Sequence, residues 1–80
     1  MNDTKERVAR CFATVFPDIR QDEIATASME SVAGWDSVAH VILLSSIAEE
    51  FGLNFDLEEF RSLVSYALIV DFLERNSAHG

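Results

Sequence analysis

An uncharged segment in the middle of the chain constrains the fold most strongly. No Asp, Glu, Lys or Arg occurs between Asp36 and Glu49. Residues spaced three and four apart along this segment share one helical face: His40, Leu43, Leu44, Ile47 and Phe51. Gly52 follows, and glycine is favoured at the left-handed residue that ends a helix. We therefore predict a helix from Ser37 to Phe51. Other helices must cover much of the apolar surface around it.

Three further segments of the chain predict helices. They run from about Thr4 to Phe16, ended by Pro17; from Leu57 to Arg61, a short helix entered through Asp56; and from Tyr66 to about Arg75, with Ser65 as N-cap. No stretch alternates between apolar and polar residues for long enough to form a strand. We predict one all-α domain over residues 1–80, a four-helix bundle with three longer helices and one short third helix, and a frayed tail from about residue 76 to 80.

A long irregular connection, Asp18 to Asp36, precedes the uncharged segment. Connections of this length are uncommon in compact domains and often carry function. A chain this short buries only roughly 60% of its unfolded surface, so it needs a dense core, and 49% of its residues are hydrophobic. Apolar positions that share helical faces predict this core: Phe12, Val15, Leu43, Ile47, Phe51, Phe55, Leu63, Ile69 and Phe72.

The charge balance narrows the classes of partner. Six basic residues stand against fourteen acidic ones, which gives a formal net charge of −8. We expect no nucleic-acid partner, because phosphate binding requires a basic face. An acidic domain attracts partners that carry basic patches. Charge alone, however, favours the simpler role in solubility.

The single cysteine excludes an internal disulfide. Cys11 lies on the core stripe of the first predicted helix, so we expect a buried structural thiol rather than a nucleophile. The sequence shows no secretory leader and no apolar run of membrane-spanning length. We expect a cytoplasmic monomer that does not associate with membranes.

Ser37 lies where the long connection becomes a helix. A helix N-terminus gathers unpaired backbone amides and positive dipole, and it accommodates a phosphate well. Asp36 can cap this helix or help to bind a cation. Position alone favours the ordinary interpretation, in which Ser37 is itself an N-cap.

Apolar residues also occur outside the core face of the second helix. Val38, Val41 and Ile42 occupy positions where a surface helix ordinarily carries charge. We expect Val38 and Val41 to be largely exposed, and exposed apolar clusters usually mark contact surfaces. Trp35 either anchors the long connection by packing or belongs to the same partner surface, and the sequence favours neither.

His40 lies one turn after Ser37 on the core side of the helix. One interpretation has the imidazole packing in the interior with a hydrogen bond. The other has it touching a phosphate or Asp36. The packing interpretation is favoured.

Residues 34–41, GWDSVAHV, resemble the attachment motif of phosphopantetheine carrier domains, the acyl carrier proteins, in which Asp-Ser-Leu opens the second helix. The Trp before Asp-Ser and the His three places after Ser are similar to a variant in free-standing carriers. Residues 47–55, IAEEFGLNF, resemble the acidic helix end and apolar loop of the family, and residues 65–73 resemble its last helix. The resemblance covers about Val8 to Glu74.

This resemblance implies a non-enzymatic carrier with the four-helix fold of that family. A separate phosphopantetheinyl transferase would attach 4′-phosphopantetheine covalently to Ser37, next to Asp36. The prosthetic thiol would then carry acyl or aminoacyl groups as thioesters between loading and condensing enzymes. The resemblance implies no catalytic and no metal-binding residue on the carrier itself.

Two departures from the family pattern bear on the pathway. Ala39 and Ile42 stand two and five residues after the serine, where carriers of fatty-acid synthesis usually have acids. Docking through acidic contacts at this helix start is therefore not expected. The predicted partner surface is apolar instead and consists of Trp35, Val38, Val41 and Ile42. This points to a specialised biosynthetic pathway, such as polyketide, nonribosomal peptide or fatty-acid-like synthesis.

Two other classes of function were weighed against the carrier. The alternative is an acidic helical protein-interaction module without a prosthetic group, in which Ser37 only caps the helix. An enzyme is disfavoured, because no acid–base or nucleophile–base pair is visible in the sequence. No cluster of His, Cys and Asp has the spacing of metal ligands.

Overall fold

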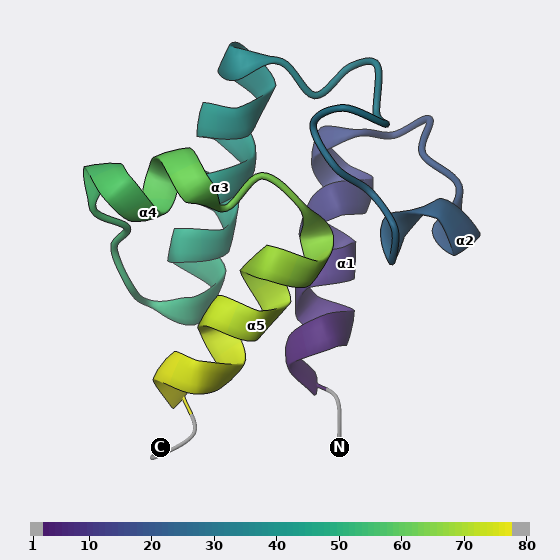
Figure 1. The fold of residues 1–80 in the computed structure, drawn as a ribbon. Coiled ribbons are helices and arrows are strands. Elements are labelled where there is room, and N and C mark those ends of the chain that lie inside the picture. The colour runs from purple at the N-terminus through teal and green to yellow at the C-terminus, as the bar shows by residue number, and fades with distance from the viewer. Residues whose placement is uncertain (1–2, 78–80) are drawn as a thin grey trace.

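The computed structural model describes residues 3–77, which form five helices (Figure 1). Their bounds are α1 Asp3–Val15, α2 Gln21–Ile24, α3 Ser37–Phe51, α4 Leu57–Ser62 and α5 Tyr66–Ser77. The described residues contain no strand, and their only β-type pairing is an isolated bridge between Ser28 and Ser65. The predicted all-α class is therefore confirmed, with one helix more than the four that the sequence predicts.

The additional helix, α2, is a single turn within the long connection. The Glu23 carboxylate accepts a hydrogen bond of 3.1 Å from the backbone N–H of Arg20, which stabilises the start of the turn. Ile24 is buried at its end. The prediction of an irregular segment from Asp18 to Asp36 is wrong here, because one turn with one buried residue produces no helical periodicity in the sequence.

The longer helices lie close to their predicted bounds. Helix α3 has the predicted bounds, and Gly52 ends it with a left-handed φ of 65°. Helix α1 stops one residue short of the predicted Phe16. Helix α5 continues to Ser77, so the predicted fraying is wrong for residues 76 and 77, whereas residues 78–80 lie outside the described part of the chain.

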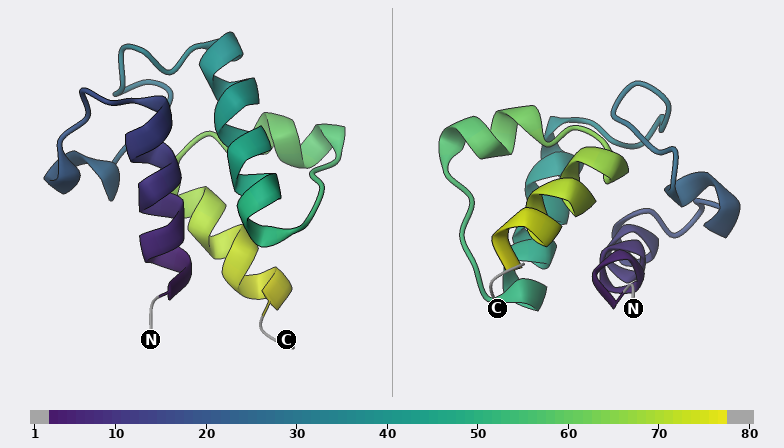
Figure 2. Two further views of the ribbon diagram at one scale, coloured as in Figure 1. Left: turned by 180° about the vertical axis from the view of Figure 1, so that it is seen from behind. Right: turned by 60° about the horizontal axis from the view of Figure 1, so that its bottom comes forward.

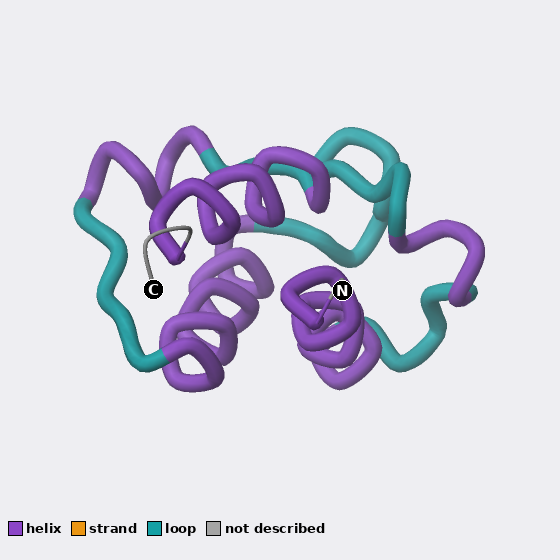
Figure 3. The backbone as a smooth tube through the Cα atoms, turned by 90° about the horizontal axis from the view of Figure 1, so that it is seen from below, coloured by secondary structure: helices purple, strands orange, loops and turns teal. Residues whose placement is uncertain are grey.

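Helices α1 and α3 lie side by side and antiparallel, as Figures 1 and 2 show. Helix α1 packs against α2, α3 and α5. The end of α1 and the start of α3 therefore lie at one end of the molecule, together with the long connection (Figure 1). Figure 3 looks along α1 and α3 and shows the loop after α3 and the turn of α2 at opposite edges of the molecule.

Phe12 of α1 is the centre of the core. It is fully buried, and its ring lies 5.3 Å from Trp35, 5.6 Å from Tyr66 and 6.0 Å from Phe16. Aromatic pairs at such separations contribute beyond the area that they bury.

The predicted core is correct in part. Five of the predicted residues are buried: Phe12, Leu43, Ile47, Leu63 and Ile69. The other four are only half-buried against the core: Val15, Phe51, Phe55 and Phe72. Val15 and Phe51 are the last residues of α1 and α3, whereas Phe55 lies in the loop after α3 and its ring packs against that of Phe72 at 5.5 Å. A cation covers part of Phe51, because the Arg7 guanidinium carbon lies 4.3 Å from the centre of its ring.

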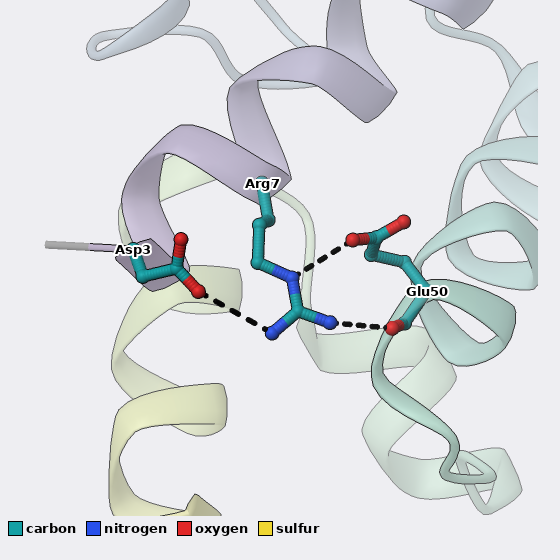
Figure 4. A network of polar contacts seen from close by, with 3 residues as sticks. All are labelled: Asp3, Arg7 and Glu50. Carbon is teal, nitrogen blue, oxygen red and sulfur yellow. Dashed lines mark hydrogen bonds and ion pairs between the residues drawn. The ribbon is translucent and has the colours of Figure 1, made fainter.

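Arg7 joins the start of α1 to the end of α3 (Figure 4). Its Nε donates to the Glu50 carboxylate at 2.8 Å, and a second guanidinium nitrogen donates to the Glu50 carbonyl at 2.6 Å. Asp3, one turn earlier on α1, lies 3.6 Å from the same guanidinium. Because both α3 contacts come from one planar group, they fix the orientation of the two helices as well as their separation.

The long connection is held in place by backbone hydrogen bonds to the junction between α4 and α5. Met29 N–H donates to Val64 C=O at 3.0 Å, and Tyr66 N–H donates to Ala27 C=O at 3.0 Å. Ser65 at this junction also caps α5 as predicted, since its hydroxyl accepts from Leu68 N–H. The segment that leads to Ser37 is thus tied to the other end of the chain.

The position of Phe12 predicts a large loss of stability when its ring is removed. Phe12→Ala should lower the free energy of unfolding by about 3–5 kcal/mol, because it leaves a cavity among three aromatic rings. Urea unfolding followed by circular dichroism measures this change. Leu57→Ala is the control, because Leu57 is 67% exposed and should change stability by less than about 0.5 kcal/mol. Equal losses in the two variants would contradict the assignment of Phe12 to the core.

Candidate functional site

Asp36 caps helix α3. Its backbone is extended, and its carboxylate accepts a hydrogen bond of 2.9 Å from Ala39 N–H. The Asp36 carbonyl accepts the first helical hydrogen bond, from His40 N–H at 2.8 Å. These are the two defining contacts of an N-cap residue. The ordinary interpretation of Ser37 as the cap is therefore wrong, and Ser37 is the first residue inside the helix.

The Ser37 side chain is exposed at this helix start. Within residues 3–77, no group forms a hydrogen bond to its hydroxyl. The first backbone amides of a helix have no carbonyl partner within the helix, and the dipole places partial positive charge there. A phosphate ester on the Ser37 oxygen would therefore meet unpaired donors and positive potential, without displacing an existing contact.

Trp35, two residues before the serine, is buried. Only 2% of its surface is exposed, its ring lies edge-on to Phe12, and its indole N–H donates to His40 Nδ1 at 3.0 Å. The prediction that Trp35 belongs to a partner surface is wrong. The sequence leaves two roles open for Trp35, and the structure shows that it is the packing anchor. The indole can be buried completely because its N–H has a buried hydrogen-bond acceptor.

His40 is buried one turn below Ser37 and uses both ring nitrogens. Nδ1 accepts from the Trp35 indole, and Nε2 lies 2.7 Å from the backbone carbonyl of Phe60 at the α4 helix. An indole N–H only donates and a carbonyl only accepts, so these partners select the neutral imidazole with its proton on Nε2. The favoured interpretation, a packed imidazole with a hydrogen bond, is confirmed, and the ring makes two hydrogen bonds. Neither ring nitrogen is left to contact a phosphate or the Asp36 carboxylate.

The outer side of α3 presents an apolar surface next to Ser37. Val38 is 69% exposed, Ile42 51% and Val41 48%. These three residues are the α3 apolar face. The predicted exposure of Val38 and Val41 is confirmed, and the first acidic residue within the helix is Glu49, near its far end. The face therefore offers a partner apolar contact without charge.

The remaining candidate groups offer no second site. Burial raises the pKa of the Cys11 thiol, and the nearby Glu50 carboxylate acts in the same direction, which keeps the thiol protonated. Within residues 3–77, no three His, Cys, Asp or Glu side chains are grouped so that they could hold a metal ion. No helix in the same range is long and apolar enough to cross a membrane.

Comparison with known proteins adds no relative: no protein-family model matches the chain, and no curated protein matches its sequence significantly.

The geometry predicts different stability effects at the two adjacent residues. Asp36→Ala should lower the free energy of unfolding by about 1 kcal/mol, because the Ala39 amide loses its acceptor. Ser37→Ala should change it by less than about 0.5 kcal/mol, because no contact is lost. Thermal and urea unfolding measure both, and Asp36→Asn is the rescue control, since asparagine also caps helices well. If Ser37→Ala lowers the free energy of unfolding more than Asp36→Ala does, Ser37 and not Asp36 is the N-cap.

Proposed function

We propose that this protein is an acyl carrier protein that holds 4′-phosphopantetheine on Ser37 and is not itself an enzyme. The observation that carries the proposal is the exposed Ser37 hydroxyl, which has no hydrogen-bond partner among residues 3–77 and directly follows the helix cap that Asp36 supplies. A serine needed for structure would be expected to make a contact at this position. The Ser37 hydroxyl makes none with residues 3–77, which favours a serine that another protein modifies.

The arrangement of the helices supports the same proposal. Residues 34–41 resemble the attachment motif of phosphopantetheine carriers. The three longer helices α1, α3 and α5 and the short α4 are similar to the bundle of that family, and α2 is an additional turn. In such a bundle the modified serine opens the second long helix, which is the position of Ser37 here.

Ser37 would act as the nucleophile in the attachment reaction. Its Oγ would form a bond to the phosphorus of coenzyme A that bears the pantetheine, while the bond between that phosphorus and 3′,5′-ADP breaks. The serine proton would pass to a base of the transferase, since the imidazole of His40 is buried and occupied. When bound, the prosthetic group would supply a thiol that carries acyl or aminoacyl groups as thioesters.

The α3 apolar face is the proposed docking surface for the transferase and for the loading and condensing enzymes. It lies within the first two turns that follow Ser37, so an enzyme acting at the serine would cover it. The net charge of −8 would speed the encounter with basic partners. The absence of acids at the helix start favours a specialised pathway over general fatty-acid synthesis.

A protein-interaction module without a prosthetic group is the second candidate. The exposure of the α3 apolar face supports it as well as it supports the carrier. The two candidates differ at Ser37, because the interaction module has no use for a free hydroxyl.

Modification of Ser37 is the direct test. Co-expression with a phosphopantetheinyl transferase of broad specificity should add one phosphopantetheine to the wild type, as measured by intact mass. Ser37→Ala should show no adduct and an unchanged circular dichroism spectrum. Ser45→Ala is the matched control, because Ser45 is also exposed on α3, and it should be modified fully. An unmodified wild type would favour the interaction module, and an adduct on Ser37→Ala would refute the site.

The docking surface predicts a second result. Val38→Asp and Val41→Asp should each slow transfer at least about ten-fold, since burial of a charge in an apolar contact costs more than 1.4 kcal/mol. Leu68→Asp is the control, because Leu68 on α5 is 46% exposed, close to the 48% of Val41. Transferase kinetics, with circular dichroism for folding, compare the three. Equal rates in all three variants would place the docking surface elsewhere.

A further inference from the structure

A groove lies beside the candidate site, between the end of α1 and the long connection. Its apolar lining residues include Phe16, Ile19 and Val32 and are called its floor, and the acidic residues Asp18 and Glu23 also line it. Its volume is about 610 Å³, within the range of roughly 300–1,000 Å³ that is usual for small-molecule sites. The groove therefore has the size and the apolar floor of a site for a small organic group.

The groove is within reach of a group attached to Ser37. Gly34, which lines it, precedes the serine by three residues, and three residues span at most about 11 Å even when extended. The end of α1 and the start of α3 lie at the same end of the molecule in Figure 1 and in the left view of Figure 2. A phosphopantetheine arm is longer than three residues of chain, so its thiol end can reach the groove while its phosphate stays at the helix start.

The interior on the other side of α3 is closed to such an arm. Trp35 and His40 fill the space below Ser37, and the Phe60 ring packs edge-on to the imidazole at 4.9 Å. All buried side-chain polar atoms in residues 3–77 have partners. An acyl chain could enter between α3 and α4 only by breaking the hydrogen bonds of His40, whereas the groove is already open.

The charges along the groove select between kinds of cargo. The Asp18 carboxylate is exposed and forms no ion pair or hydrogen bond with any described residue. The Glu23 carboxylate accepts a hydrogen bond from Arg20 N–H and forms no ion pair with a described residue. A cationic amine would be attracted to this edge, and a carboxylate would be repelled. The apolar floor would meanwhile cover the hydrocarbon part of the cargo.

We infer that the groove between α1 and the long connection binds the cargo of the Ser37 arm, and that this cargo is an aminoacyl group. The inference rests on the proposed carrier function. The amine would lie against Asp18 and Glu23, and the carbon chain would lie on Phe16 and Val32. The thioester would then be held beside the protein until a partner enzyme withdraws it.

The test compares three cargoes of nearly equal size on ¹⁵N-labelled protein. A broad transferase attaches β-alanyl, butyryl or malonyl pantetheine to Ser37, as hydrolysis-resistant amide analogues, and intact mass verifies each adduct. Backbone amide shifts are measured against the form with a free thiol. The β-alanyl form should shift the amides of Ile19 and residues 31–34 most, the butyryl form less, and the malonyl form least. Failure to form any adduct would refute the carrier function, not the groove.

Two variants and one control locate the effect. Asp18→Lys should reduce the β-alanyl shifts roughly 1.5- to 5-fold, as expected for an exposed ion pair, and leave the butyryl shifts unchanged. Glu74→Lys makes the same change in net charge on exposed α5 surface and should change neither. Ala33→Trp should fill the groove and abolish both sets of shifts.

Three outcomes would overturn the inference. Shifts confined to Val38 and Ala39 with every cargo would show that the arm stays in solvent. Shifts at Leu43 and Phe60 would place the cargo between α3 and α4. Equal shifts for the β-alanyl and malonyl forms would remove the selection for an amine. If Ala33→Trp does not fold, the comparison of Asp18→Lys with Glu74→Lys still decides between support and rejection.

Discussion

The hydrogen-bonded chain from the Trp35 indole through the His40 imidazole to the Phe60 carbonyl is the interaction on which the site end of the molecule depends. It joins three segments that are separate in the sequence: the end of the long connection, the first turn of α3, and α4. The indole N–H can only donate and the carbonyl can only accept, so these two end groups fix the order of donors and acceptors through the imidazole. Loss of the imidazole would leave a buried indole N–H without an acceptor, which costs about 1–3 kcal/mol. Asp36 and Ser37 lie between Trp35 and His40, and their backbone is therefore held from both sides.

The sequence predicts α3 well because its determinants are local. The Asp36 cap and the Gly52 stop lie immediately next to the helix, and both act through their own backbone or side chain. The exposure of Val38 and Val41 also follows from helical geometry, since they lie opposite a face that is already buried. Features fixed by the chain within one or two turns are thus accessible to sequence reasoning.

The features that the sequence does not predict depend on distant residues. The burial of Trp35 requires Phe12 on another helix and the imidazole of His40, and neither contact produces a periodic signal. Helix α2 is too short for periodicity. The groove forms only when the end of α1 meets residues 31–34, and its two acidic residues, Asp18 and Glu23, lie five residues apart in a segment without helical periodicity. The only sequence signal for the groove is the long connection itself, which contains acidic residues and scattered apolar ones.

The stability of the fold explains little of the apolar surface that Val38 presents on α3. Val38 keeps 69% of its surface in water, so its burial in the folded chain removes little apolar area. A polar residue with good helix propensity would serve α3 equally well at this position. A partner that covers Val38, Val41 and Ile42 would gain about 25 cal/mol for each Å² of apolar surface that it removes from water. The exposure of Val38 is therefore better explained by the proposed docking surface than by folding. The same argument applies to the Ser37 hydroxyl, which forms no hydrogen bond with any residue from 3 to 77.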